Sequence, residues 1–545
     1  MSGYPARAHD SQGPLAGLVG TGSMLRLAVR RDRVLLPVWI AVFVVMAASS
    51  AAATVGLYPT VADRVKAAQD MNGTQSLVAM YGRVYDPTSL GALAMWKMTA
   101  LGGVFVAVLA LISVVRHSRA EEESGRLELL GATVVGRAAP LTAALLLAVG
   151  TDLVLAALTA LALVTAGLPV AGSIAFGLSW AGTGIAFAAV AAVTAQLSVS
   201  ARAATGTASA LLGLAYLLRA TGDAAGPGGP GWLSWLSPVG WGQQVRPYAG
   251  NRWWVLLVPI AFAAVTTVGA YVLVSRRDLG AGLLPDRPGR ATAAPSLRSP
   301  LALAWRLQRN LLFAWAAAFA VMGAVVGNLA SSAGNLLNSQ QSRDFITKLG
   351  GEKGLTDAFL ATEMGFIGVI VSVFGVQAAM RLRSEESSQR AEPLLATSVS
   401  RTRWAASHLT IAMAGTAVLL LVGGLAAGAT HAAHMHDVGQ VGRVLGGTLV
   451  QLPAAWVLTA IVAAAFGLAP RLTVLGWAAL VGFLLIGEVG PLLKLKQWIM
   501  DMSPFAHAPK LPGAPFTLTP LLWLLGIAAA TTAAGLVGFR RRDIG

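Results

Sequence analysis

Apolar runs long enough to cross a lipid bilayer recur along the whole chain and constrain its fold more than any other feature. A transmembrane helix needs about 20 predominantly apolar residues, and twelve stretches of this kind alternate with polar segments. They lie at 35–57, 92–115, 139–166, 173–197, 203–220, 253–274, 310–331, 360–380, 405–430, 443–467, 472–490 and 518–539. Because helices satisfy their own backbone hydrogen bonds in lipid, we expect an all-α polytopic membrane protein with twelve transmembrane helices.

The composition agrees with a membrane-embedded chain. Charged residues make up 12% of the sequence, whereas soluble proteins carry about 25%. The absence of cysteine excludes disulfides, thiolate metal sites and cysteine nucleophiles. A net charge of +16 is also typical of nucleic-acid-binding proteins, but here the basic residues lie at span ends and not on one continuous face. We therefore expect no nucleic-acid partner.

The basic residues also predict the orientation of the helices, because Lys and Arg collect in cytoplasmic loops. Arginines precede the first span, follow the second, join the fourth to the fifth and follow the sixth, and the second half repeats this arrangement. Both termini are therefore expected in the cytoplasm. The excess of Arg, with abundant Ala and Gly, is typical of GC-rich bacteria and favours a bacterial plasma membrane.

Several segments of the first half recur in the second. The stretch RAEEESGRLELLGATVVGR (119–137) aligns without a gap with RSEESSQRAEPLLATSVSR (383–401), and RRDLG (276–280) is echoed by RRDIG (541–545). Since both halves start on the same side, we expect two parallel pseudo-symmetric six-helix halves related by an axis along the membrane normal. The predicted parts are a polar tail (1–24), a first half (25–280), a cytoplasmic linker (281–300) and a second half (301–545).

The repeated charged stretch lies between the second and third predicted spans of each half. Its leucines and clustered glutamates predict a short helix on the inner surface, with its carboxylates facing a cationic partner in the cytosol. The candidate coupling residues are Glu121, Glu122, Arg126, Glu128, Glu385, Glu386, Arg390 and Glu392. The alternative is that these charges only interact with helix dipoles, at about 0.3–1 kcal/mol each. Pro393, which replaces Leu129, is expected to end any helix there.

Motifs for chemistry within the chain are scarce. The sequence contains neither a Walker phosphate loop nor any Gly-Lys dipeptide, so ATP and Mg²⁺ are not expected to bind here. No catalytic constellation stands out, and we expect no catalytic or cofactor-binding residues. The one metal-like cluster, in THAAHMHD, consists of His431, His434, His436 and Asp437. Imidazole suits Zn or Cu, but such a cluster is also common polar loop sequence.

The glutamate pair, the Leu-Glu-Leu-Leu run at 127–130 and the closing Arg137 resemble the intracellular loop of ABC-2-type exporter permeases. The twelve-span duplicated form resembles actinobacterial exporters of polyketide antibiotics and related multidrug permeases. The resemblance implies a transport subunit, not an enzyme. It would export hydrophobic or amphipathic compounds and bind a separate ATPase, usually a homodimer, that holds ATP and Mg²⁺. Each half would present one coupling loop to one ATPase subunit.

Two other functions are compatible with the sequence. An ion-gradient-driven secondary transporter also fits twelve spans in two parallel halves, and such carriers bury ionisable groups. Asp152 is the clear mid-span carboxylate, and its counterpart in the repeat is Thr416. A membrane-embedded enzyme acting on lipid-linked substrates would need acidic or histidine clusters at an interface, and only 431–437 qualifies.

A pair of charges predicts an outer gate. When the fifth span is aligned with the eleventh, Arg202 meets Arg471 at the inner end and Arg219 meets Glu488 at the outer end. In the resembling family these spans line the central path, so the pseudo-two-fold axis would bring Arg219 and Glu488 face to face near the exit. The alternative is that each charge reaches separately to the outer headgroups.

Overall fold

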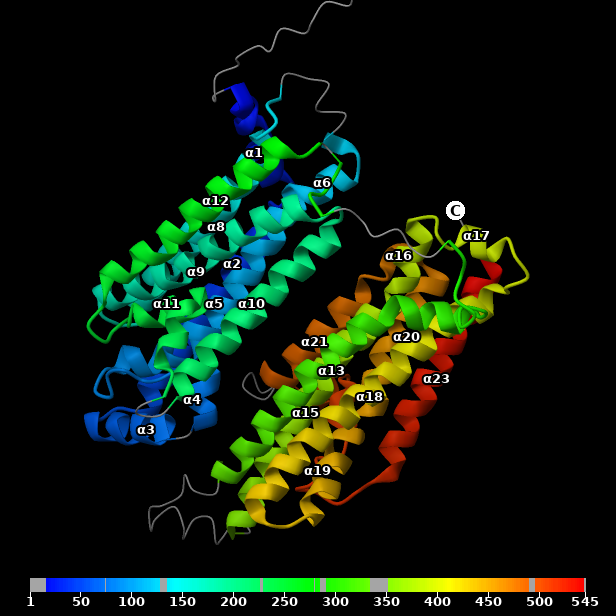
Figure 1. Cartoon of the computed structure of the whole chain (residues 1–545). Coiled ribbons are helices and arrows are strands. Elements are labelled where there is room, and N and C mark those ends of the chain that lie inside the picture. Colours follow the sequence, from blue (N-terminus) through cyan, green and yellow to red (C-terminus); the bar gives the residue numbers. More distant parts are fainter. Residues whose placement is uncertain are drawn as a thin grey trace, which may run out of the picture. The chain divides into compact units, whose positions relative to one another are not determined.

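The computed structural model describes residues 16–73, 75–127, 135–225, 229–278, 280–284, 291–333, 351–489 and 496–543. All secondary structure assigned within these residues is helical. The chain divides into two compact units, Met1–Pro288 and Gly289–Gly545, and each is described by itself (Figure 1). The boundary between the units falls within the stretch 281–300.

Eleven of the helices in the described residues are long and apolar enough to cross a membrane. They coincide with all the predicted spans except 203–220, and they confirm an all-α chain with many membrane-spanning helices. The residues 203–220 do form part of a helix, α10 (Ala201–Ala224). It is less apolar than the others because it carries Arg202, Arg219 and Asp223, so its membrane crossing stays a prediction.

In the first unit, five apolar helices and α10 run side by side along most of their length (Figure 1). The five are α2 (Leu35–Leu57), α5 (Leu90–His117), α8 (Ala139–Thr165), α9 (Val170–Leu197) and α12 (Leu257–Arg276). Helix α9 is the most buried of these spans and packs against α5, α8 and α12. Small residues allow the close approach: a Cβ at Gly177 would lie 2.4 Å from the carbonyl oxygen of Ala156.

The second unit packs its helices in a similar way. Its long helices are α13 (Pro300–Ala333), α15 (Gly351–Ala379), α18 (Arg401–Met435), α20 (Leu452–Leu468), α21 (Leu475–Val489) and α23 (Leu518–Arg541). The region equivalent to α9 is divided into α19 (Gly439–Leu449) and α20. The division comes just before Pro453, which lies in the first turn of α20, where proline is favoured because its missing N–H needs no partner.

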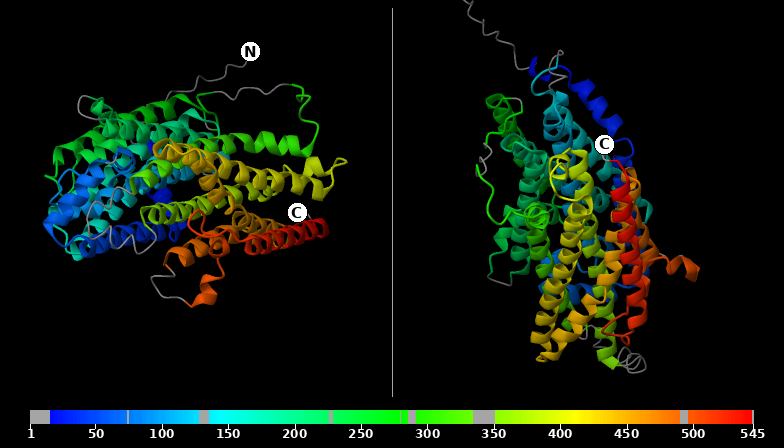
Figure 2. Two further views of the ribbon diagram at one scale, coloured as in Figure 1. Left: turned by 90° about the horizontal axis from the view of Figure 1, so that it is seen from below. Right: turned by 90° about the vertical axis from the view of Figure 1, so that its right-hand side faces the viewer.

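Short helices lie at both ends of the first bundle and at one end of the second (Figures 1 and 2). One end of the first unit carries α1 (Thr21–Arg31) and α6 (Arg119–Glu123), and the corresponding end of the second carries α16 (Arg381–Ser387), α17 (Glu392–Leu395) and η5 (Pro470–Leu472). We call these the basic ends. The opposite, far end of the first unit carries α3 (Val61–Gly73), α4 (Gln75–Tyr81), η2 (Gly231–Leu236), α11 (Pro238–Gln244) and η3 (Trp253–Leu256). In the second unit η6 (Pro504–His507) and α22 (Gln497–Met500) precede α23.

Candidate functional site

A buried ion pair joins the repeated charged stretch to the last helix of the first unit. Helix α5 ends at His117, and the backbone turns at Ser118 (φ −123°, ψ −84°) before α6 begins. This turn directs Glu122 toward the end of α12. The guanidinium of Arg277, the residue that caps α12, donates to both carboxylate oxygens of Glu122 at 2.6 and 2.7 Å. Such bidentate pairs are among the strongest hydrogen-bonded contacts in proteins.

Further contacts enclose the same carboxylate. The backbone N–H of Gly280 donates to Glu122 Oε1 at 2.6 Å, and Arg119 Nη1 donates to Oε2 at 3.0 Å. Arg119 is only 1% exposed, and it also donates to the carbonyl oxygens of Val199, Gly280 and Ala281. Glu122 therefore ties α6 to the chain after α12, and Arg119 adds the turn before α10.

The second unit builds the same contact from the second copies of the same motifs. Arg542, the residue that caps α23, donates to Glu386 at 2.9 Å, and Arg383 lies 3.4 Å from the same carboxylate. The neighbouring Glu385 pairs with Arg381 at 2.6 Å. We call the pairs Glu122–Arg277 and Glu386–Arg542 the clamps. Each joins the glutamate pair of one half to the RRD motif that closes it.

The clamps change the expected orientation of the coupling glutamates. Glu122, Glu385 and Glu386 are buried, so the expectation that their carboxylates face outward is wrong for these three. The last helix of each half supplies an arginine to these carboxylates: Arg277 pairs with Glu122, and Arg542 pairs with Glu386. Glu121 accepts hydrogen bonds from Arg31 of α1 and, at 3.4 Å, from Arg126.

Other predicted coupling residues do face outward. The side chains of Arg126 and Arg390 occupy matching positions in the two copies, and each is 58% exposed. Glu392 is also exposed. Glu128 lies outside the described residues. A role of this set in docking a partner stays a prediction, and the exposed arginines are now its best-placed members.

Pro393 does not end a helix, which corrects the sequence-based expectation. It lies in the first turn of α17, where its fixed φ angle suits a helix start. Helix α16 ends at Ser387, and the chain then turns at Gln389, whose φ is 56°. The proline therefore starts a new short helix after this turn.

Sequence reasoning missed how the segment before the first span is fixed. Asp32, between α1 and α2, lies 2.6 Å from His117 Nε2 and 3.1 Å from Arg116 Nη2. Together with the Arg31–Glu121 contact, this holds α1 against the start of the charged loop. The signal in the sequence was a single acidic residue within the run RRDR (30–33).

The predicted gate arginine is enclosed at the far end of the first unit. Arg219 is fully buried and lies 3.5 Å from Asp223, one turn along α10. It also donates to the carbonyl oxygen of Met80 in α4, at 3.0 Å, and Ser234 of η2 donates to Asp223 at 2.5 Å. We call this group the far-end latch.

The predicted pair between Arg219 and Glu488 stays a prediction. Glu488 belongs to α21, and its side chain lies outside the described residues. To form the pair, Arg219 would have to leave the partners that hold it in the latch. Near the latch, burial raises the pKa of Tyr85 to about 12, so this phenol stays neutral beneath the guanidinium of Arg246.

The histidine cluster does not converge on a common point. His431 is buried within the bundle, whereas His434 faces the carbonyl oxygen of Thr430 at 2.8 Å. His436 is exposed, and Asp437 accepts a hydrogen bond from Gln440 at 2.7 Å. In the part of the chain that the structure describes, no group of three or more His, Cys, Asp or Glu residues is arranged to hold a metal ion.

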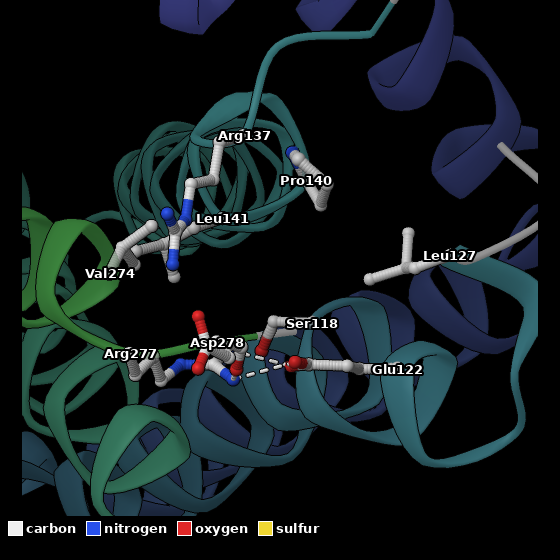
Figure 3. Close-up of a pocket in the computed structure, with 9 residues that line it drawn as sticks. All are labelled: Ser118, Glu122, Leu127, Arg137, Pro140, Leu141, Val274, Arg277 and Asp278. Atoms are coloured by element: carbon white, nitrogen blue, oxygen red, sulfur yellow. Dashed lines mark hydrogen bonds and ion pairs between the residues drawn. The ribbon is translucent and has the colours of Figure 1, made fainter. Parts of the chain in front are cut away.

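The first unit also contains a buried carboxyl group and a small cavity. Asp152 is buried in α8, and neither of its carboxylate oxygens has a hydrogen-bond partner among the described residues. Beside the first clamp is a cavity of about 40 Å³ (Figure 3). Its lining residues are Ser118, Glu122, Leu127, Arg137, Pro140, Leu141, Val274, Arg277 and Asp278. It is far smaller than pockets for drug-sized ligands, which are about 300–1,000 Å³.

Long apolar helices in two bundles define a multi-pass membrane protein, and comparison with known proteins shows its family. The family model described as "Multidrug efflux system permease Rv1217c, C-terminal domain" matches residues 22–273 and 297–540. The multidrug efflux system permease protein Rv1217c of Mycobacterium tuberculosis (strain ATCC 25618 / H37Rv) is 47% identical over 532 residues, which are 97% of this chain and 96% of that protein. The chain therefore belongs to this family of multidrug efflux permeases, and the predicted permease class is confirmed.

Proposed function

We propose that this chain is the transmembrane subunit of an ATP-driven exporter of the ABC-2 type. A separate ATPase, expected to be a homodimer, binds and hydrolyses ATP with Mg²⁺. The absence of a Walker motif in the chain means that any use of ATP requires such a partner. The multidrug efflux permease that shares 47% of its residues supports an exporter of hydrophobic or amphipathic compounds. Export of polyketide antibiotics rests on the family resemblance alone.

The proposed topology has twelve spans in two parallel six-helix halves, with both termini in the cytoplasm of a bacterial cell. Two observations support it. Helix α10 has 24 residues, which at 1.5 Å per residue is long enough to cross the hydrocarbon core. The arginines of both basic ends belong to the segments that the positive-inside rule assigns to the cytoplasm.

The two clamps are the main structural support for this proposal. In each half, the loop after the second span is fixed by a buried ion pair to the end of the last span. A displacement of the loop is therefore transmitted to that span instead of being absorbed by a flexible connection. Arg126 and Arg390 form only long ion pairs, with Glu121 at 3.4 Å and with Glu385 at 4.0 Å. Their exposed side chains would contact an acidic surface of the ATPase, because charges at an interface rim steer association.

Asp152 supports a second candidate, a secondary efflux transporter driven by an ion gradient. Its buried and unpaired carboxyl group is the kind of intramembrane residue that ion-coupled carriers use. The two candidates differ in their energy source. The experiment is transport of a hydrophobic fluorescent dye by the purified permease in proteoliposomes, with and without the ATPase that co-purifies with it. We expect transport only with both the ATPase and ATP. Transport by the permease alone along an imposed proton or sodium gradient would establish the second candidate instead.

A further inference from the structure

An open, basic pocket lies at the basic end of the second unit. It has a volume of about 380 Å³ and is formed where α16, η5 and the end of α23 come together. Its lining residues are Arg383, Ala469, Pro470, Arg471, Leu472 and Arg542. Three of these six are arginines and none is acidic, so the pocket is electrostatically suited to an anion.

The nearby carboxylate does not neutralise these arginines. Glu386 is shared between Arg542 and Arg383, so this group of three keeps one positive charge. Arg471 adds a second, since it is exposed and forms no ion pair with any described residue. Arg542 is also held in place, because its guanidinium lies 5.0 Å from the ring centre of Phe466. The guanidinium of Arg542 is therefore positioned before any ligand arrives.

The first unit fills the corresponding position with its own groups. The carboxylate of Glu123 accepts a hydrogen bond from the backbone N–H of Ala201, at 2.8 Å. In the aligned sequences Ser387 replaces Glu123, and Pro470, which has no N–H, replaces Ala201. The second unit has thus lost both the internal anion and its donor, while the arginines remain.

The arginine next to the clamp shows the same difference. In the first unit Arg119 is enclosed by the carbonyl oxygens of Val199, Gly280 and Ala281. Its counterpart Arg383 is 34% exposed and lines the pocket. Its guanidinium is therefore accessible to an outside ligand.

An apolar surface continues from the pocket. Leu472 lines the pocket and is half exposed, and Leu468, at the end of α20, is 64% exposed. Val474 and Leu475, which lead into α21, are also exposed. A ligand that fits both surfaces has an anionic head and an apolar tail. That is the chemistry of an acidic phospholipid, and basic pockets between transmembrane helices on the cytoplasmic side bind such headgroups.

We propose that this pocket binds the phosphate group of one acidic phospholipid from the cytoplasmic leaflet, and that the first unit has no equivalent site. The choice of leaflet rests on the topology given under the proposed function. Binding itself does not depend on ATP coupling, so lipid retention is measured on the full-length permease without the ATPase, which is added only in one competition experiment. Failure of the lipid site and failure of ATP coupling are therefore separate results.

The test is native mass spectrometry of the permease released from nanodiscs of phosphatidylglycerol and phosphatidylcholine. The wild-type chain should retain one phosphatidylglycerol molecule. Arg471→Gln should weaken its retention about fivefold, the effect of about 1 kcal/mol that one basic residue has near an acidic membrane surface. Ser387→Glu should weaken it at least as much, since it restores the carboxylate found in the first unit. The matched control Arg202→Gln, at the position equivalent to Arg471, should leave retention unchanged.

Three outcomes would overturn the proposal. Equal loss of lipid in Arg471→Gln and Arg202→Gln would show general attraction to the membrane and no specific site. Displacement of the lipid by an excess of inorganic phosphate would show that the pocket takes the free anion. Displacement by the purified ATPase, at unchanged lipid concentration, would show that the arginines form a protein interface. Thermal unfolding of each variant, expected to match the wild type, establishes that the exposed substitutions leave the fold intact.

Discussion

In the first unit the arginine that accompanies the clamp is enclosed by backbone carbonyls, whereas in the second the equivalent arginine lines an open pocket. Both units nevertheless keep the same glutamate and the same arginine at the end of the last helix. The comparison separates a contact that both halves share from the surroundings, which differ between the halves. The pair that fixes the loop to the bundle is retained in both halves, while the groups around it differ and give each half its own surface.

The two halves also differ in one aligned charge, Arg219 in the first and Glu488 in the second. In the first unit Arg219 and Asp223 are buried beneath α4 and η2 and hold these short helices to α10. The second unit has a glutamate in α21 at the position aligned with this arginine. Two aligned helices thus carry different charges, and the described arrangement of the first serves to fix its own far end.

The largest expected effect comes from removing the clamp glutamate of the first unit. Glu122→Ala leaves Arg119 and Arg277 without their shared carboxylate, and loss of one partner from a buried pair costs about 3–5 kcal/mol. Glu386→Ala should cost less, because Arg383 and Arg542 are 34% and 18% exposed and water can solvate them. Thermal unfolding in detergent measures both. Equal destabilisation would show that enclosure does not distinguish the clamps.

Next in size is the far-end latch. Arg219→Met leaves the buried Asp223 without its cation, but that ion pair is long at 3.5 Å and Ser234 still donates to the carboxylate. The cost should therefore be about 1–3 kcal/mol, less than for the clamp. Glu488→Gln is the comparison: an unchanged unfolding temperature would show that this glutamate does not belong to the latch, and an equal loss would show that it does. If instead Arg219→Glu and Glu488→Arg each impair export and the double exchange restores it, the two charges meet and the predicted gate is correct.

Reversal of the exposed coupling arginines should leave stability almost unchanged. Arg126→Glu combined with Arg390→Glu alters side chains that are 58% exposed, and surface substitutions usually change stability by less than about 0.5 kcal/mol. Binding of the ATPase, measured by co-purification, should fall about tenfold if each charge contributes about 0.7 kcal/mol, half of the 1.4 kcal/mol per tenfold change. Normal binding would remove these residues from the interface.

The smallest effect is expected at Asp152. Because its carboxyl group has no hydrogen-bond partner among the described residues, Asp152→Asn removes no described interaction. Dye export with ATP should stay within about twofold of the wild type, well below the 1.4 kcal/mol that a tenfold change requires. Abolished export with an intact ATPase complex would indicate ion coupling through this residue, and would make the two halves functionally unequal at Thr416.

Much of this architecture follows from the sequence, because length and apolarity determine which segments cross a membrane. Eleven predicted spans coincide with suitable helices. The predicted span 203–220 is the exception. The helix that contains it, α10, is less apolar because of Arg219 and Asp223, which are compensated by each other and by Met80 and Ser234 of other elements. A local pattern contains no information about such distant partners.

The clamps were visible only in part. The glutamate pair and the RRD motif each occur twice at nearly the same spacing, which showed that they matter. Their contact depends on how the fold brings α6 close to the end of α12. Neither motif contains that information. The nearly equal spacing of two repeated, oppositely charged motifs is the signal from which the pairing could have been inferred.

The most direct test of coupling through the clamps is the number of dye molecules exported per ATP hydrolysed, measured in proteoliposomes that contain permease and ATPase. Arg277→Glu and Glu122→Arg alone should lower this ratio at least tenfold while the ATPase still binds, because the loop is no longer fixed to the last helix. The double exchange should restore part of it, since contacting residues act non-additively. An unchanged ratio in both single variants, with the complex intact, would contradict the claim that the clamps transmit the ATPase movement.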